Sequence, residues 1–155
     1  MRISEILSEE RIVVDCDGSR IVDKETALRE LGALLAPSLG VKGSIVYQLL
    51  FDREQLQSTG IGEGVAIPHA STDDAATQAA ALLLCPRGLA FDSIDGSPVR
   101  IVFGVVGPRK ATGEHLRTLA RISRLLRDAG TRSGLLDCMD AKSALRLALS
   151  HDEPS

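Results

Sequence analysis

Two nearly uninterrupted apolar stretches, AAALLLC at 79–85 and VRIVFGVVG at 99–107, constrain the fold more than any other feature of the chain. A strand with one face in water alternates apolar and polar residues, whereas a strand covered on both faces can be apolar throughout. We therefore expect both stretches to be interior strands of a sheet. A further strand is expected at 11–17, where β-branched residues precede an Asp-Gly turn.

Helical signals come before and after these strands. Asp23 is placed to cap a first helix, and Ser44 to cap a second that covers IVYQLLFDREQLQ. A long helix is expected to begin near Thr112 after the strand at 99–107, because leucines and isoleucines then recur at helical spacing. Two shorter helices, at 134–139 and 141–150, are expected to complete the chain.

The remaining segments predict how these elements are joined. VAIPH at 65–69 is expected to be a strand, CPRG at 85–88 a turn, and FDSIDGSP at 91–98 a loop. Helices on both sides of a cluster of apolar strands indicate an α/β sandwich, in which a mixed sheet is flanked by helices on both faces. We expect a single domain over residues 1–155.

The composition argues against several classes of function. The chain has 18 Lys and Arg against 21 Asp and Glu, and its aromatic content is 3%, so neither a basic footprint nor a stacking platform for nucleic acid is expected. The cysteines at 16, 85 and 138 form no C-x-x-C pair, which predicts reduced thiols. With no apolar run of membrane-spanning length and no signal peptide, a cytoplasmic protein without membrane insertion is expected.

The stretch STGIGEGVAIPHA at 58–70 contains the clearest candidate site. Its glycines are Gly60, Gly62 and Gly64. Glycine lets backbone N–H groups approach an anion, but the order of elements fits neither a Walker loop nor a dinucleotide fingerprint, so the glycines alone predict a tight helix-to-strand connection. Pro68 fixes the backbone before His69, and we expect His69 at a strand end with its ring held in one direction.

Three other residues are candidates, each with an ordinary structural interpretation beside it. His115 belongs to the first turn of the long helix, where free N–H groups favour an anion, although a histidine at the edge of the core is equally consistent. Arg53 could bind a phosphate with its planar fork, or be a surface arginine. Ser58 could form a hydrolytic triad with His69 and an aspartate, but the G-x-S-x-G elbow is missing.

Three motifs in this order, RE-x-x-x-STGIGEGVAIPHA, FDSIDGSPVRIVFGVVGP and EHLRTLARISRLL, resemble the enzyme IIA domain of the fructose and mannitol class. These domains carry phosphoryl groups in the bacterial phosphoenolpyruvate-dependent phosphotransferase system, and the resemblance covers about residues 3 to 150. It implies that His69 accepts a phosphoryl group from a histidine phosphocarrier protein. It also implies that His115 positions and stabilises phosphorylated His69, and that Arg53 contacts the phosphate.

The resemblance also bears on the wider site and on partners. Ser58 and Thr59 would border the pocket, and the glycines at 60, 62 and 64 would leave room for the partner's histidine. No cofactor or metal is expected, because imidazole itself supplies the nucleophile. A free-standing chain of this size resembles the nitrogen-related enzyme IIA, which binds a regulated target protein. The alternatives are a sugar-specific IIA that passes phosphate to a IIB component, a binding module that does not use phosphate, or a hydrolase.

Overall fold

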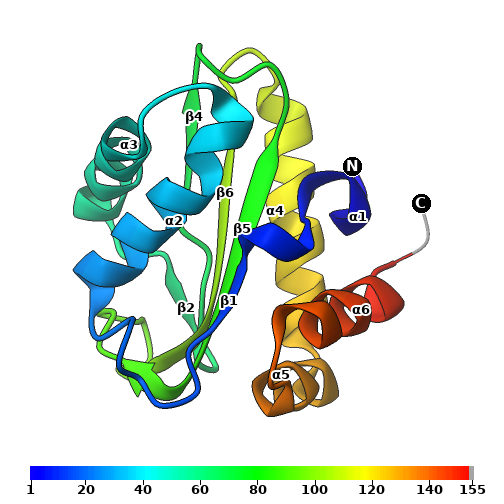
Figure 1. Ribbon diagram of the computed structural model, residues 1–155. Coiled ribbons are helices and arrows are strands. Elements are labelled where there is room, and N and C mark those ends of the chain that lie inside the picture. The colour runs from blue at the N-terminus through cyan, green and yellow to red at the C-terminus, as the bar shows by residue number, and fades with distance from the viewer. Residues whose placement is uncertain (154–155) are drawn as a thin grey trace.

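The two apolar stretches form the longest strands of the protein and pair with each other, antiparallel, in the middle of the sheet. The computed structural model describes residues 1–153 and places six strands in one sheet, in the order β1-β5-β6-β3-β2, with β4 also paired to β6 (Figure 1). The strands are β1 (Ile12–Val14), β2 (Gly60–Gly62), β3 (Val65–Ala66), β4 (His69–Thr72), β5 (Ala79–Leu89) and β6 (Val99–Pro108). Parallel and antiparallel pairs both occur, so the predicted mixed sheet is confirmed.

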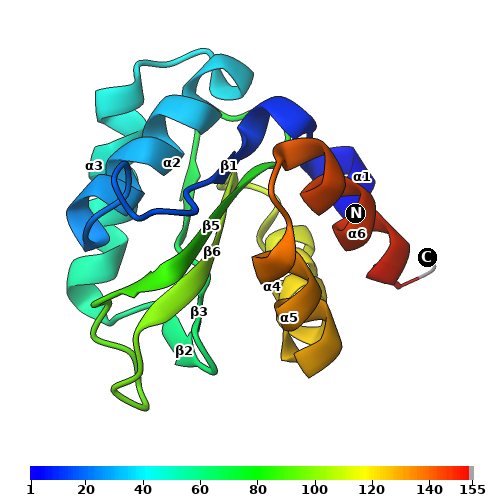
Figure 2. The same ribbon diagram turned by 60° about the horizontal axis from the view of Figure 1, so that its bottom comes forward.

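Helices cover both faces of this sheet (Figure 2). α2 and α3 pack on one face, and α1, α4, α5 and α6 lie on the other. The helices are α1 (Ile3–Ile6), α2 (Lys24–Leu39), α3 (Gly43–Leu56), α4 (Thr112–Arg127), α5 (Ala129–Asp137) and α6 (Ala141–His151), with a short 3-10 turn at Glu9–Arg11. The predicted α/β sandwich is confirmed. Residues 154 and 155, which the single-domain prediction also includes, lie outside the described residues.

Successive residues of β5 point to opposite cores, which is why this strand is apolar throughout. Leu83 and Cys85 pack with α2 and α3, whereas Leu82 and Leu84 pack with α4, α5 and α6. The three cysteines are free thiols, as predicted. Burial and the nearby Asp15 carboxylate raise the pKa of the Cys85 thiol to about 12, so this thiol stays protonated in the core.

Three of the predicted element boundaries are wrong, two because of local side-chain hydrogen bonds and one because of strand pairing. The strand expected at 11–17 ends at Val14, since the Asp15 carboxylate accepts hydrogen bonds from two backbone N–H groups across the following turn. The segment 85–88 is not a turn but a bulged part of β5, which stays paired with β6 up to Leu89. The short helix expected at 134–139 begins earlier, because Asp128 caps α5 through the N–H of Thr131.

The start of α3 also differs from the prediction. Asp23 caps α2 as expected, accepting from the N–H of Thr26 at 2.8 Å, but Ser44 lies inside α3 and Lys42 occupies the N-cap position. The reason is the close approach of α2 and α3. A Cβ at Gly32 would lie 2.7 Å from the carbonyl oxygen of Gly43, so the two helices touch through glycine where α3 begins.

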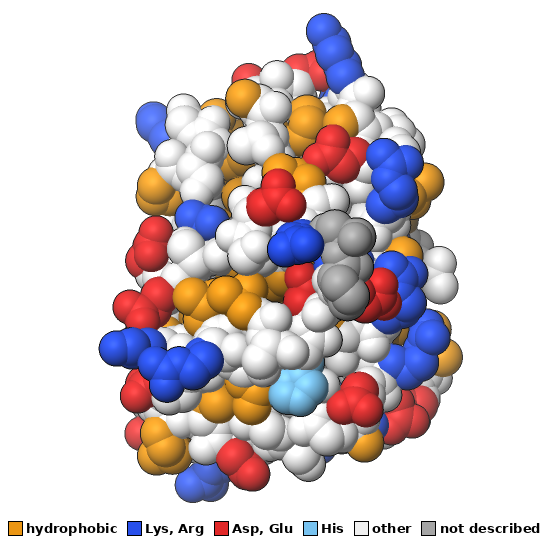
Figure 3. All heavy atoms as spheres, turned by 90° about the vertical axis from the view of Figure 1, so that its right-hand side faces the viewer, with side chains coloured by type: hydrophobic (Ala, Val, Ile, Leu, Met, Phe, Trp, Pro, Cys, Tyr) orange, Lys and Arg blue, Asp and Glu red, His pale blue; other side chains and the backbone are white. Residues whose placement is uncertain are grey.

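Ion pairs connect residues 152 and 153 to α4. Arg121 Nε lies 2.7 Å from Asp152 Oδ1, and Arg124 Nε lies 2.5 Å from Glu153 Oε1. The other Asp152 oxygen accepts from the backbone N–H of Ile3 at 2.9 Å. Figure 3 shows acidic and basic side chains interspersed on the face that carries α6. This mixture suits the small net charge of −3 and offers no basic stripe for nucleic acid on that face.

Candidate functional site

His69 begins β4 at a break in the edge of the sheet. β3 and β4 run parallel to β6 one after the other, with Ala66 opposite Val102 and His69 opposite Val105. Pro68 falls between them and has no N–H to donate, but its carbonyl oxygen accepts from the N–H of Val105 at 3.0 Å. The sequence predicts one strand that ends at His69. Instead pairing with β6 resumes there, so His69 is the first residue of a new strand.

The carbonyl oxygen of Ile67 holds the His69 ring. His69 Nδ1 lies 2.7 Å from this oxygen. A carbonyl oxygen can only accept, so the hydrogen-bond network assigns the ring hydrogen to Nδ1 in the neutral imidazole. The free lone pair then belongs to Nε2, which is the ring atom available to attack an electrophile.

A cavity of about 380 Å³ adjoins His69. Three other predicted site residues, Arg53, Ser58 and Thr59, belong to its wall. The rest of the wall comes from Gln57, Ile61, Ile67, Ile94, Leu119, Ala120 and Ser123. The cavity is therefore lined by a half-buried imidazole, a guanidinium and several apolar side chains.

His115 faces His69 from the first turn of α4. The two ring centroids are 5.9 Å apart and the ring planes are inclined at 53°. His115 Nδ1 is buried without a hydrogen-bond partner among the described residues. Gly107 of β6 lies beneath this ring: a Cβ there would lie 3.4 Å from His115 Nδ1 and 2.9 Å from Gln78 Cγ, so a larger residue would first displace the Gln78 side chain. The structure therefore brings the two predicted histidines together.

Arg53 reaches the site from the last turn of α3. Its Nη1 donates to the carbonyl oxygen of Gln57 at 2.9 Å, which uses one of the five N–H groups of the guanidinium. Its charge acts on His69 by lowering the pKa of the imidazole. An arginine fork beside a nucleophilic nitrogen is suited to hold a phosphate or carboxylate.

The hydroxyl groups of Ser58 and Thr59 fix the loop between α3 and β2. Ser58 Oγ donates to the carbonyl oxygen of Phe91 at 2.7 Å, and Thr59 Oγ1 donates to Glu54 Oε1 at 2.6 Å. No carboxylate joins Ser58 and His69 in the hydrogen bonds of the described residues, so the geometry does not favour the hydrolytic triad. Ser58 and Thr59 therefore shape the wall beside His69.

The glycines at 60, 62 and 64 form the β2–β3 hairpin. A Cβ at Gly60 would lie 2.5 Å from Ser93 Oγ, so this position packs directly against the loop that follows β5. Gly62 and Gly64 have φ of 96° and 76°, which turns the chain sharply between the two strands. These two glycines border neighbouring hollows rather than the cavity beside His69. Their predicted role in partner access is open to test.

Burial controls the protonation of both histidines. It lowers the pKa of His69 below the usual 6.5, and the Arg53 charge adds to this effect, while the Ile67 carbonyl and Glu54 act in the opposite direction. Burial also lowers the pKa of His115, with a further contribution from His69. Because both pKa values are lowered, the neutral form of each ring predominates at pH 6.5 and above.

This protonation behaviour gives a direct prediction. In an NMR titration of the imidazole resonances, we expect the midpoints of His69 and His115 to lie below 6.5 in the folded protein. The control is the same titration in urea, where burial is lost and both midpoints should return to about 6.5. A midpoint above 6.5 for folded His69 would mean that the Ile67 hydrogen bond and the Glu54 charge, and not burial, dominate its environment.

Comparison with known proteins places this geometry in a family. The model of the family "Phosphoenolpyruvate-dependent sugar phosphotransferase system, EIIA 2" matches residues 5–150. The chain belongs to this family. A nitrogen regulatory protein of Bradyrhizobium diazoefficiens is 35% identical to this EIIA 2 chain over 143 residues, or 92% of each protein. The fructose-specific EIIABC component of Bacillus subtilis is 30% identical over 154 residues, which are 99% of this chain and 24% of that protein.

Solved structures agree with this placement. The nitrogen regulatory protein IIA-Ntr of Neisseria meningitidis has a TM-score of 0.86 and 33% identity, and the match covers 94% of this EIIA 2 chain and 98% of that one. Mannitol IIA of Escherichia coli has a TM-score of 0.74 and 25% identity, over 92% and 98% of the two chains. The family predicted from the three motifs is confirmed, and the chain is a phosphotransferase-system component.

Within residues 1–153, no helix combines the length and apolar character needed to cross a bilayer. Across the same residues, His, Cys, Asp and Glu side chains form no group of three that could hold a metal ion.

Proposed function

We propose that the protein carries a phosphoryl group on Nε2 of His69, which it receives from a histidine phosphocarrier protein. The hydrogen bond between His69 Nδ1 and the Ile67 carbonyl carries this proposal, because it leaves Nε2 as the only ring nitrogen with a free lone pair. The Nε2 lone pair attacks the phosphorus atom. The bond between phosphorus and the donor histidine breaks, and its electron pair returns to the donor ring.

The neighbouring residues match what this reaction needs from a protein. Phosphoryl transfer depends mainly on positioning and on stabilisation of negative charge. Arg53 supplies a fixed positive charge in the wall of the same cavity, and His115 places a second ring 5.9 Å from the His69 ring, centroid to centroid. A phosphoryl group bound to nitrogen keeps a high transfer potential, which suits a relay or regulatory protein better than a hydrolase.

For the biological role, we propose a nitrogen-type regulatory IIA. Relatives named nitrogen regulatory protein that match almost end to end support this role, as does the structural match to IIA-Ntr. A second candidate is a sugar-specific IIA that passes phosphate to a IIB component. It is favoured by the fructose-specific relative and by the solved complex of Escherichia coli mannitol IIA with phosphorylated IIB, whose IIA-type fold matches with a TM-score of 0.74.

Intact-mass measurement tests the proposal. The protein would be incubated with phosphoenolpyruvate, enzyme I and either a sugar-type or a nitrogen-type phosphocarrier, and a sample without enzyme I serves as the control. We expect an acid-labile gain of one phosphoryl group. A faster gain with the nitrogen-type carrier supports the regulatory role, and a faster gain with the sugar-type carrier supports the second candidate. If neither carrier gives a gain, the phosphocarrier proposal is wrong.

A further inference from the structure

Glu54 has a buried carboxylate next to the site. This carboxylate has no part in the proposed phosphoryl-transfer step itself. Its side chain is 2% exposed, although its neighbours in α3 are more accessible: Arg53 is half-buried and Gln55 is exposed. Its two oxygens accept from a single residue of the loop: Thr59 N donates to Oε2 at 3.0 Å and Thr59 Oγ1 donates to Oε1 at 2.6 Å. Glu54 therefore fixes both the backbone and the side chain of Thr59.

Thr59 in turn fixes the residue that holds the His69 ring. The carbonyl oxygen of Thr59 accepts from the N–H of Ile67 at 3.0 Å. The carbonyl oxygen of Ile67 is the group that accepts from His69 Nδ1 at 2.7 Å. An unbroken path of hydrogen bonds therefore leads from the Glu54 carboxylate through Thr59 and Ile67 to the imidazole.

The opposite end of this path is anchored on another helix. Lys24 Nζ, from the first turn of α2, lies 2.7 Å from Glu54 Oε2. The same ammonium group lies 4.8 Å from the centre of the Phe91 ring, and the Phe91 carbonyl accepts from Ser58. Lys24 of α2 thus contacts α3 through Glu54 and the loop after β5 through Phe91, and both of these are bonded to the loop before β2.

We propose that Glu54, held by Lys24, is a positioning residue that keeps the His69 ring oriented with Nδ1 on Ile67 and Nε2 free. This inference rests on the proposed function, since it assigns Glu54 a part in phosphoryl acceptance by His69. Without the carboxylate, Thr59 loses both of its acceptors and the segment that carries the Ile67 carbonyl is released. The ring can then turn, or take the tautomer with hydrogen on Nε2, in which Nε2 has no free lone pair with which to attack phosphorus.

Energetics favour a positioning role over a purely stabilising one. Removing an ion pair from water costs about as much as the attraction between its members returns, so a buried pair is a poor source of stability. It is better suited to define one geometry. Glu54 also acts on the ring through its charge, because it opposes Arg53 by raising the pKa of His69.

The experiment compares Glu54→Ala and Glu54→Gln with the wild type by two readouts. Nitrogen-15 NMR of the His69 imidazole reports which nitrogen carries the hydrogen, without any phosphorylation. The initial rate of phosphoryl transfer from the carrier reports the consequence. We expect Glu54→Ala to populate the Nε2–H tautomer and to slow transfer by about tenfold or more, as misplaced reacting groups do. Glu54→Gln keeps an oxygen acceptor for Thr59 and should recover most of both properties.

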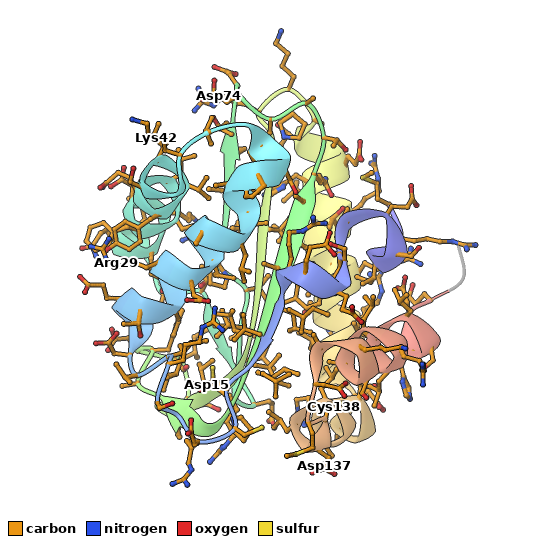
Figure 4. All side chains as sticks on the ribbon, viewed as in Figure 1. Asp15, Arg29, Lys42, Asp74, Asp137 and Cys138 are labelled. Carbon is orange, nitrogen blue, oxygen red and sulfur yellow. The ribbon has the colours of Figure 1, made fainter. Side chains whose placement is uncertain are left out.

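Asp15 offers a matched control. It is another carboxylate that is 5% exposed, and it accepts from the N–H groups of Arg20 and Ile21 at 3.1 and 2.7 Å. Figure 4 shows Asp15 at one end of the molecule and Asp74, which follows β4, at the other. Asp15→Asn should therefore lower the melting temperature while leaving the His69 tautomer and the transfer rate unchanged.

The results for the Glu54 variants test the positioning role, and the result for the wild type tests the proposed function. If folded Glu54→Ala keeps the wild-type tautomer and rate, or if Asp15→Asn changes them equally, Glu54 is not a positioning residue. If Glu54→Ala does not fold, Glu54→Asp replaces it, because the shorter side chain keeps the charge but withdraws from Thr59. An unchanged tautomer in that variant overturns the inference. If wild type accepts no phosphoryl group, the proposed function fails, and the tautomer measurement still tests the path to Glu54.

Discussion

His69→Gln is expected to abolish the acid-labile phosphoryl gain, whereas His115→Ala is expected to keep it at a lower rate. Glutamine preserves a polar side chain of similar reach but has no ring nitrogen with a lone pair, so the bond to phosphorus cannot form. His115 lies 5.9 Å from His69 between ring centroids. In the proposed function, it would stabilise charge on the phosphoryl group that His69 accepts. We expect a loss of about tenfold to a thousandfold in rate for His115→Ala, the range found for groups that stabilise a transition state.

Intact mass over time, for both variants and for the wild type, measures these effects. His151 provides the matched control because it is an exposed histidine at the end of α6, on a different element from the cavity. His151→Gln should be phosphorylated at the wild-type rate. The opposite pattern, a retained label in His69→Gln and a lost one in His115→Ala, would exchange the roles of the two histidines.

The elements that follow from local chemistry are predictable from the sequence. β5 and β6 could be recognised because residues covered on both faces leave an apolar run, and the cap at Asp23 needs only residues within one turn. His69 could be singled out because Pro68 restricts the backbone before it. The three motifs then led to the family, which the match over residues 5–150 confirms.

Two features of the site were missed because they depend on contacts between distant segments. The break between β3 and β4 falls at Pro68, but the resumption of pairing at His69 is decided by β6, more than 30 residues later, which no local pattern reveals. Glu54 looks like an ordinary charged residue near the end of a surface helix. Its burial depends on Lys24 and Thr59, which come from another helix and from a loop. The only signal in the sequence was its place beside Arg53 in the motif that starts RE.

Ile94→Asp is expected to weaken the productive encounter with the phosphocarrier without slowing the transfer step. In the proposed function, the attacking nitrogen of His69 must come within about 3 Å of the phosphorus atom on the carrier's histidine, so the carrier must cover the cavity beside His69. Ile94 belongs to the wall of that cavity yet is 77% exposed. It is held in this position, because its N–H donates to the carbonyl oxygen of Gly60 at 3.3 Å and anchors the loop after β5 on β2. An exposed isoleucine fixed at the mouth of a reactive site is suited to contact a partner.

Initial rates at increasing carrier concentration separate the two effects. We expect Ile94→Asp to raise KM about tenfold, the effect of losing one well-placed apolar contact, and to change kcat little because His69, His115 and Arg53 are untouched. Met139→Asp is the matched control, since Met139 is also 77% exposed but lies between α5 and α6. It should leave both constants unchanged. An equal rise in KM for Met139→Asp would place the carrier elsewhere, and a fall in kcat alone for Ile94→Asp would mean that the loop after β5 shapes the reaction rather than the encounter.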